Sequence, residues 1–189
     1  MKESIAEELE CLEVVVEAPA SIANLGPGFD ILAMAIELFS DRVRLCVRDG
    51  VGEVYVRVHG YRVPCGRDNV VYSVVKEFIK RYGFSNLDYY IELYKGVPVS
   101  CGLGSSGASA AAISYALSIL LKQDLGSGEL VELAGYGEST IAGTPHYDNV
   151  SASLLGGIVL VDPSKPRVYK LCSKTDFWIN IVIPRIDHG

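Results

Sequence analysis

The sequence has few of the side chains that most often bind transition metals or cross-link a fold. Its 189 residues include five cysteines and three histidines. The cysteines are odd in number, lie far apart and never form a C-x-x-C pair; they are Cys11, Cys46, Cys65, Cys101 and Cys172. Zinc sites and disulfide frameworks are indicated by characteristic cysteine spacings, so the sequence predicts neither.

An excess of positive charge, a targeting segment and a long apolar run are also missing. The net charge is −6 and the pI is about 5.1, which argues against nucleic acid as a partner. The first residues are acidic and lack the basic-then-apolar pattern of a signal peptide. The apolar run at 108–121 is shorter than the roughly 20 residues that a membrane-spanning helix needs, so no membrane partner is predicted. We therefore expect a cytoplasmic protein.

Glycines and hydroxyls are concentrated at residues 97–109, VPVSCGLGSSGAS, directly before an alanine-rich helical run. Glycine lets the backbone turn tightly and approach a ligand, and a helix N-terminus offers unpaired N–H groups to an anion. The stretch therefore predicts a phosphate-binding loop. The alternative is a glycine loop that only caps a buried helix.

Two better-known phosphate loops do not fit this stretch. Residues 102–107 satisfy G-x-G-x-x-G, but the dinucleotide fingerprint needs a helix and then a strand ending in an acid about 20 residues on. Residues 108–121 form one apolar run with no room for both elements, and Asp124 lies just past its end. No G-K-[ST] follows the glycines, which excludes a Walker loop. A nicotinamide-dependent dehydrogenase is therefore disfavoured.

Hydrophobic periodicity predicts one α+β domain with a mostly antiparallel sheet. Strands are expected at 12–18, 41–47, 53–58, 87–94, 155–161, 168–171 and 177–183. Helices are expected at 68–82, 108–121 and 127–141, with Asp68 as the cap of the first. Residues 31–38 fit either a short helix or a strand, and residues 19–30 are rich in turn formers.

Polar residues suited to ligand binding lie in several further places. Asn24 and Asp30 flank glycines, where Asn and Asp commonly form turns. Glu138 fits a solvated helix face, His146 an ordinary loop histidine and Asn149 a helix cap. Taken singly, each of these residues is better explained by structure than by ligand binding.

Taken together, PASIANLGPGFD, VPVSCGLGSSGAS and HYDNVSASLLGG resemble three motifs of the galacto-, homoserine, mevalonate and phosphomevalonate kinase superfamily, in the same order. The first and third are most similar to the forms found in its homoserine kinases. The resemblance implies a two-layer α+β N-terminal domain at 1–184, with 185–189 as the start of a C-terminal domain that the chain lacks. It implies ATP-dependent phosphorylation of the L-homoserine hydroxyl to O-phospho-L-homoserine, in threonine biosynthesis, and leaves a homodimer open.

The resemblance also implies roles for individual residues. ATP would be bound by Pro98, Val99, Ser100, Cys101, Gly102, Leu103, Gly104, Ser105, Ser106, Gly107, Ala108, Ser109 and, at the adenine, Asn69. Ser106 and Glu138 would hold Mg²⁺, a hard cation that needs only one or two protein oxygens beside phosphate and water. The homoserine pocket would consist of Asn24, Asp30, His146 and Asn149, with Asp30 facing the substrate ammonium group. The expected catalytic residues are Asn149, Glu138 and Ser106.

Asn149 occupies the position at which mevalonate kinase relatives are expected to carry a catalytic aspartate, and an amide cannot act as a general base. The implied mechanism is positioning and charge stabilisation during in-line attack of the substrate hydroxyl on the γ-phosphate. The neighbouring Asp148 is expected to point elsewhere, and the family's substrate-binding arginines would lie beyond residue 189. Two alternatives stay open: another small-molecule kinase of the superfamily, or a nucleotide-binding unit without catalysis.

Overall fold

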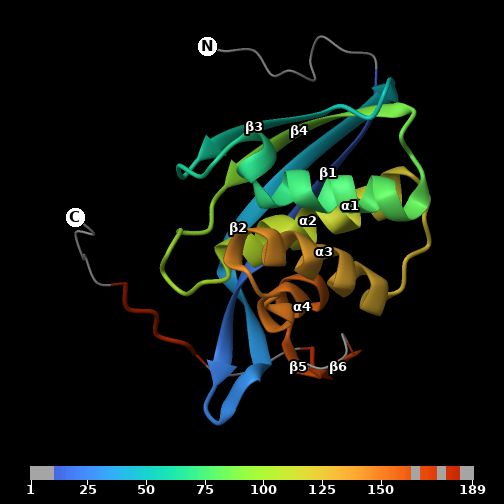
Figure 1. Cartoon of the computed structure of the whole chain (residues 1–189). Coiled ribbons are helices and arrows are strands. Elements are labelled where there is room, and N and C mark those ends of the chain that lie inside the picture. The colour runs from blue at the N-terminus through green and yellow to red at the C-terminus, as the bar shows by residue number, and fades with distance from the viewer. Residues whose placement is uncertain (1–10, 163–166, 174–177, 184–189) are drawn as a thin grey trace.

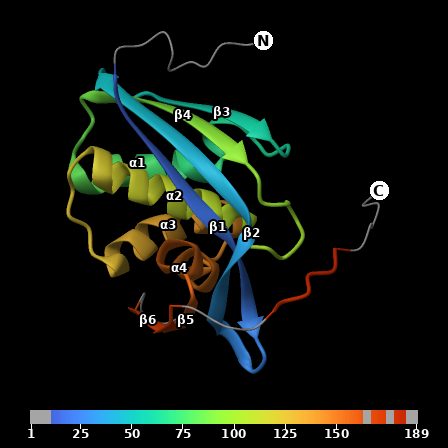
Figure 2. The same ribbon diagram turned by 180° about the vertical axis from the view of Figure 1, so that it is seen from behind.

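A computed structural model describes residues 11–162, 167–173 and 178–183. Within these residues six strands form one sheet, and four α-helices pack against one of its faces (Figures 1 and 2). The sheet and the helices bury their apolar faces against each other, which is the defining feature of a two-layer domain. The predicted α+β fold is therefore confirmed.

The described sheet is antiparallel except at one edge. Its strand order is β3 (Val54–Gly60), β4 (Leu87–Lys95), β2 (Gly28–Asp49), β5 (Ile158–Asp162) and β6 (Arg167–Cys172), while β1 (Leu12–Leu25) pairs with β2. The one parallel pair is β3 with β4. The 22-residue β2 pairs with β5 near its start and with β4 along its second half, so a single long strand connects the two ends of the domain.

The segment 19–30 is not the turn-rich loop that its composition predicts. β1 and β2 continue through it as a hairpin, and Gly26 and Pro27 alone lie between the two strands. Asn24 and Asp30 take left-handed backbone conformations, with φ of 57° and 55°, near the hairpin end. Pairing along a long partner strand here overrides the turn preferences of Asn, Gly and Pro. The same ladder makes residues 31–38 strand rather than helix.

The three predicted helices are confirmed, with differences at their ends. They are α1 (Val70–Tyr82), preceded by the short 3-10 turn η2 (Gly66–Asp68), α2 (Ser105–Leu120) and α3 (Ser127–Ala142). The cap of α1 is Asn69 rather than Asp68, because Asn69 Oδ1 accepts a hydrogen bond from the Val71 N–H at 3.0 Å. A fourth helix, α4 (Tyr147–Leu155), was not predicted. Its nine residues are too few for helical spacing to stand out from the strand that follows.

The prediction of a strand at 177–183 is wrong for the part that the structure describes. Residues 178–183 have no regular structure, although Ile179 and Ile181 pack against the core around Ile36. Trp178 and Val182 are 98% and 86% exposed. Alternating apolar residues make a strand only where a neighbouring strand supplies hydrogen bonds, and none of the described strands pairs with this segment. Residue 177 and the predicted domain start at 185–189 lie outside the described residues.

Helix α2 forms the centre of the core between β1 and the other helices. Its residues from Gly107 to Leu117 are buried with the exception of Tyr115, and half of these buried residues are alanines. Small side chains let a helix approach its neighbours closely, so the position of the α2 N-terminus is fixed by packing on all sides. The helices of the described chain include none that combines the length and apolarity needed to cross a bilayer.

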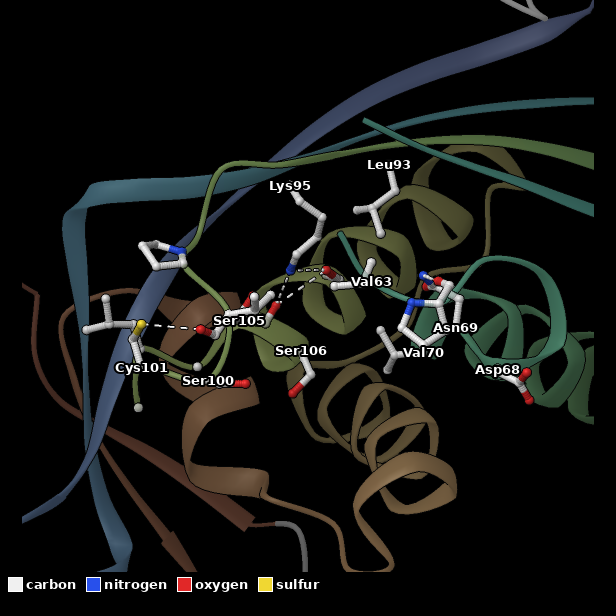
Figure 3. A pocket seen from close by; sticks show the side chains of 17 residues that line it. Val63, Asp68, Asn69, Val70, Leu93, Lys95, Ser100, Cys101, Ser105 and Ser106 are labelled. Carbon is white, nitrogen blue, oxygen red and sulfur yellow. Dashed lines mark hydrogen bonds between the residues drawn. The ribbon is translucent and has the colours of Figure 1, made fainter. Parts of the chain in front are cut away.

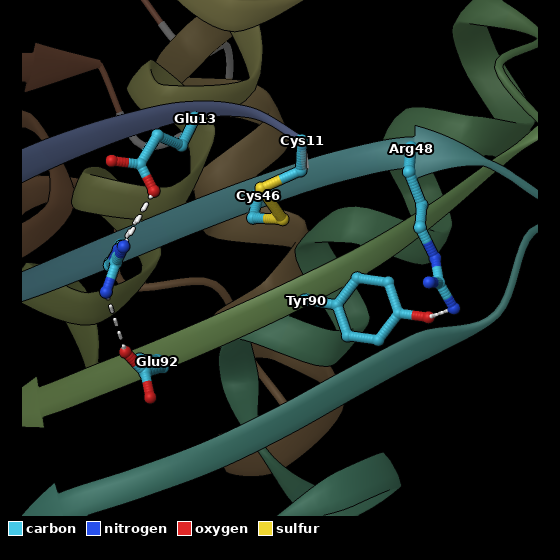
Figure 4. Close-up of a disulfide and its surroundings, with 7 residues drawn as sticks. Cys11, Glu13, Cys46, Arg48, Tyr90 and Glu92 are labelled. Atoms are coloured by element: carbon cyan, nitrogen blue, oxygen red, sulfur yellow. Dashed lines mark hydrogen bonds and ion pairs between the residues drawn. A yellow bond between two sulfur atoms is a disulfide. The ribbon is translucent and has the colours of Figure 1, made fainter. Parts of the chain in front are cut away.

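The structure corrects one expectation about the cysteines. Cys11 and Cys46 form a disulfide between β1 and β2, with a Cα–Cα distance of 5.8 Å (Figure 4). They are 35 positions apart, and they meet because Glu13 lies opposite Cys46 in the ladder. Cysteine spacing cannot reveal such a pair, since it depends on strand register. Two positions before Cys46 in β2, Arg44 bridges Glu13 at 2.8 Å and Glu92 at 3.7 Å.

Candidate active site

The glycine loop connects the end of β4 to the start of α2, as the sequence predicts. Ser100, Gly102 and Gly104 take left-handed conformations with φ of 58°, 71° and 63°. Gly104 is the N-cap of α2 and makes no side-chain cap hydrogen bond, so the first N–H groups of the helix are left for another acceptor. A Cβ at Gly104 would lie 2.1 Å from Ser21 Oγ, so the loop packs against β1 more closely than any other residue would allow.

A cavity of about 400 Å³ lies between the glycine loop and the segment that leads into α1 (Figure 3). On one side it is lined by residues 98–106 and by Lys95 and Ser109, and on the other by Val63, Pro64 and residues 68–70. All the residues predicted to bind ATP line it except Gly107 and Ala108, which face away into the fold. A volume of this size is typical of small-molecule sites.

Asn69, the residue predicted to contact the adenine, lines the cavity opposite the loop (Figure 3). Its side chain is already hydrogen-bonded within the protein: Nδ2 donates to the Pro64 carbonyl at 2.6 Å, and Oδ1 caps α1. Asn69 is 3% exposed. The structure therefore gives this residue a role in shaping the wall of the cavity, and its contact with adenine stays a prediction.

A buried ion pair beneath the loop was missed by the sequence analysis. Lys95 Nζ donates to Asp41 Oδ2, to Ser109 Oγ at 2.9 Å and to the Ser105 carbonyl at 2.7 Å. Asp41 Oδ1 accepts from the N–H groups of Gly96 and Val97, both at 3.0 Å. The Lys95 and Asp41 side chains are 2% and 0% exposed. Burial lowers the pKa of the Lys95 ammonium, while the Asp41 carboxylate opposes that shift.

These contacts hold the two ends of the loop together. The signal in the sequence was a lysine at the end of an apolar strand, directly before the glycines. Its partner Asp41 lies 54 positions away in β2, and only the pairing of β2 with β4 brings the two together.

Ser106 and Glu138 meet as predicted. Ser106 lies in the first turn of α2, and its hydroxyl donates to Oε1 of Glu138, which lies in α3, at 2.6 Å. Glu138 is 3% exposed, and its Oε2 is buried without a hydrogen-bond partner in the part of the chain that the structure describes. Burial raises the pKa of the Glu138 carboxyl, and the hydrogen bond from Ser106 opposes that shift. An unpaired carboxylate oxygen beside a hydroxyl fits a hard divalent cation, which would supply the missing partner.

A second, smaller pocket of about 240 Å³ collects part of the predicted substrate set. It is lined by Asp30 from the hairpin end and by residues 144–148 at the start of α4. Asp30 and His146 are exposed there. Asn24 does not line this pocket; its Oδ1 accepts from the Asp30 N–H at 2.9 Å and so fixes the backbone that carries Asp30. Burial raises the pKa of the Asp148 carboxyl, which accepts from the Asn149 N–H at 2.8 Å.

Asn149 lies in the first turn of α4 and joins the three predicted segments. Its Oδ1 accepts from Ser21 Oγ at 3.0 Å, which connects α4 to β1. On its other side it packs against the glycine loop, because a Cβ at Gly107 would lie 3.3 Å from Asn149 Cβ. The fold thus brings the glycine loop, the β1–β2 hairpin and α4 to one place, and Glu138 lies near His146 and Asp148 on the same side.

Comparisons with known proteins agree with this arrangement. Residues 69–157 match the family model of the GHMP kinases N terminal domain. The chain is 39% identical over 173 residues to a homoserine kinase of Sulfurisphaera tokodaii, covering 90% of this chain and 56% of that protein. It is 40% identical over 153 residues to a homoserine kinase of Thermoplasma volcanium, covering 80% and 48%. The chain therefore spans about half the length of the curated relatives that it matches.

Solved structures show the same fold. The crystal structure of a homoserine kinase from Cytophaga hutchinsonii matches with a TM-score of 0.78 at 34% identity, over 90% of this chain and 54% of that one. A mevalonate kinase from Staphylococcus aureus matches with a TM-score of 0.63 at 19% identity, over 86% of this chain and 56% of that one, and so shows the fold alone. Residues 69–157 are thus similar to the N-terminal domain of the GHMP kinases, and the described fold is similar to that of the solved homoserine kinase over 54% of the latter's chain.

Proposed function

We propose that this chain carries the nucleotide-binding part of a homoserine kinase, which transfers the γ-phosphate of ATP to the L-homoserine hydroxyl and yields O-phospho-L-homoserine for threonine biosynthesis. The observation that carries the proposal is the buried Glu138 Oε2, for which the described residues provide no hydrogen bond of ordinary geometry; Ser106, at the start of α2, donates to the other oxygen of the same carboxylate. The homoserine kinases of Sulfurisphaera tokodaii and Thermoplasma volcanium support homoserine as the acceptor.

In this proposal the glycine loop binds the triphosphate through the free N–H groups at the start of α2. Ser106 and Glu138 hold Mg²⁺, which neutralises phosphate charge when bound. The Lys95 network keeps the loop rigid, because the Lys95 ammonium at the start of the loop donates to Asp41 and to Ser105 and Ser109 at its other end. The cavity beside Asn69 takes the nucleoside.

The acceptor would lie between Asn149 and the pocket at the hairpin end. Asp30 is exposed there and suits the substrate ammonium group, and His146 lies on the opposite wall. The Asn149 carboxamide cannot take up a proton as a general base, so Asn149 contributes by orienting the substrate hydroxyl. Asp148 already accepts a hydrogen bond from the first turn of α4, which supports a role in holding that turn rather than as the base. Phosphoryl transfer depends mainly on alignment and charge neutralisation, which this arrangement can supply without a general base. As the bond from the hydroxyl oxygen to phosphorus forms, the bond to the β-phosphate oxygen breaks and ADP leaves, while the hydroxyl proton goes to an oxygen of the transferred phosphoryl group.

The test combines calorimetric titration of Mg-ATP with an ADP-release assay on homoserine and on mevalonate. We expect Mg-ATP binding by the wild-type chain, its loss in Glu138→Ala, and turnover with homoserine. Glu132→Ala is the matched control, because it removes a carboxylate from the same helix that is 48% exposed and does not line the cavity. Activity on mevalonate alone would favour another kinase of the superfamily, and binding without turnover would favour a nucleotide-binding unit that does not catalyse.

A further inference from the structure

Ser21 lies at the point where the three functional segments meet. It is fully buried in β1, and its N–H donates to the Leu103 carbonyl of the glycine loop at 3.1 Å. Its hydroxyl donates to Asn149 in α4, at 3.0 Å to Oδ1 and 3.2 Å to the main-chain oxygen. A second buried serine, Ser153, donates to Ser21 Oγ at 3.4 Å. The hydroxyl of Ser21 is therefore an acceptor from Ser153 and a donor to Asn149.

These contacts determine which way the Asn149 carboxamide faces. The one proton of the Ser21 hydroxyl can reach two oxygens of Asn149, and the shorter contact, 3.0 Å, is to the carboxamide Oδ1 rather than to the main-chain oxygen at 3.2 Å; this favours the amide oxygen at the inward position. Gly104 gives an independent argument: a Cβ there would lie 2.8 Å from Asn149 Oδ1, so a Cα hydrogen points at that atom. An oxygen accepts such a C–H contact, whereas the hydrogens of an NH₂ group would collide with it. The oxygen is thus held inward, and the NH₂ group is left to bind a ligand.

Resting on the proposed function, we propose that Ser21 is a positioning residue that makes Asn149 a hydrogen-bond donor at the site of phosphoryl transfer. The outward NH₂ would bind the oxygen of the acceptor hydroxyl and hold it in line with the γ-phosphate. Asn149 is half-buried, and no acceptor among the described residues takes a hydrogen bond from its Nδ2. A flipped amide would present its oxygen instead and accept a hydrogen bond from the hydroxyl, so the hydroxyl would be held through its proton, which then could not point at an oxygen of the γ-phosphate.

A double-mutant cycle on kcat tests this proposal with the full chain, Mg-ATP and homoserine. We expect Ser21→Ala to lower kcat about fivefold to tenfold, the effect of one orienting hydrogen bond, with KM for ATP unchanged. Asn149→Ala should lower kcat further. Because Ser21 acts through Asn149, adding Ser21→Ala to Asn149→Ala should change kcat by less than twofold. Independent, multiplicative effects would overturn the proposal.

Ser153→Ala is the matched control. It removes a hydroxyl of the same size from the same buried cluster, and Ser153 bonds to Ser21 Oγ rather than to the Asn149 side chain. We expect kcat within twofold of the wild type and a melting temperature close to that of Ser21→Ala. A loss of kcat in Ser153→Ala equal to that in Ser21→Ala would mean that general packing, not amide orientation, is responsible.

A second measurement separates failure of this proposal from failure of the proposed function. The Asn149 side-chain NH₂ resonances are assigned by their loss in Asn149→Asp and followed by ¹⁵N relaxation without substrate. We expect a rigid NH₂ group in the wild type and in Ser153→Ala, and a mobile or shifted one in Ser21→Ala. An unchanged NH₂ group in Ser21→Ala would overturn the proposal even in a chain without turnover, while absent turnover with the expected relaxation result would refute only the proposed function.

Discussion

Removal of the Asp41 carboxylate should cost this domain more stability than any substitution at its surface. Asp41→Ala leaves the Lys95 ammonium buried without its counter-ion and deprives the N–H groups of Gly96 and Val97 of their acceptor. Breaking a buried pair in this way costs about 3–5 kcal/mol. The entropy of unfolding for 189 residues is about 0.4 kcal/mol/K, so the melting temperature should fall by roughly 8–12 °C.

The measurement is urea denaturation and thermal melting of four proteins at neutral pH. They are the wild type, Asp41→Ala, the double variant Asp41→Ala/Lys95→Met, and Lys80→Ala as the control. The double variant should recover part of the loss, because it removes the stranded cation as well. Lys80 is 75% exposed in its pair with Glu77 at 3.6 Å, so its removal should change stability by less than about 1 kcal/mol. A loss below about 1 kcal/mol in Asp41→Ala, or a double variant less stable than the single one, would refute this reasoning.

Three further predictions concern the site and the outer sheet. Because burial raises the pKa of the Glu138 carboxyl, the folded state favours its protonated form. In scanning calorimetry without metal, Glu138→Gln should therefore melt at a higher temperature than the wild type at pH 7, and this gain should vanish as the pH falls below the unfolded pKa of 4.5. The same variant should lose the increase in melting temperature that Mg-ATP gives the wild type. Reduction of the Cys11–Cys46 disulfide should cost about 3–4 kcal/mol in urea titrations, and thiol titration of the unreduced, denatured chain should find three free cysteines, not five. Gly104→Ala should weaken Mg-ATP binding far more than Gly102→Ala. Both glycines have a positive φ, but a Cβ would meet neighbouring atoms at Gly104 and none at Gly102. Equal losses of affinity in calorimetric titrations would show that contact between this Cβ and its neighbours is not the cause.

The sequence predicts three of the four described α-helices and most strands, because their apolar spacing is set by local periodicity. It fails where pairing partners decide the outcome. Residues 19–30 carry turn formers but lie in a long antiparallel ladder, and residues 178–183 alternate like a strand but lack a partner among the described strands. The Cys11–Cys46 disulfide and the Asp41–Lys95 pair also depend on register, which is a property of the whole sheet.

For the candidate site, the sequence indicated the loop and several polar side chains but not all of the contacts between them. Ser106 with Glu138 and the glycine loop with its cavity lie where the motifs place them, because each motif carries its own backbone geometry. Asn24 differs, since its amide holds the backbone of Asp30 instead of lining the pocket. Ser21 was not singled out, since a serine in a strand looks like any small polar residue until α4 and the loop are packed against it.

The two parts of the proposed site differ in how much of their chemistry the described residues provide. The phosphate side has free helix N–H groups, a buried carboxylate awaiting a cation and a loop fixed by an internal ion pair. The acceptor side is a small pocket with two carboxylates, Asp30 and Asp148, and His146 as its one basic side chain. A substrate carboxylate would find no permanent cation there, and one charged hydrogen bond contributes about 1.5–3 kcal/mol, or roughly tenfold to 150-fold in affinity. We therefore expect the two proposed binding sites to be separable: Mg-ATP should bind with ordinary affinity even where homoserine binds weakly.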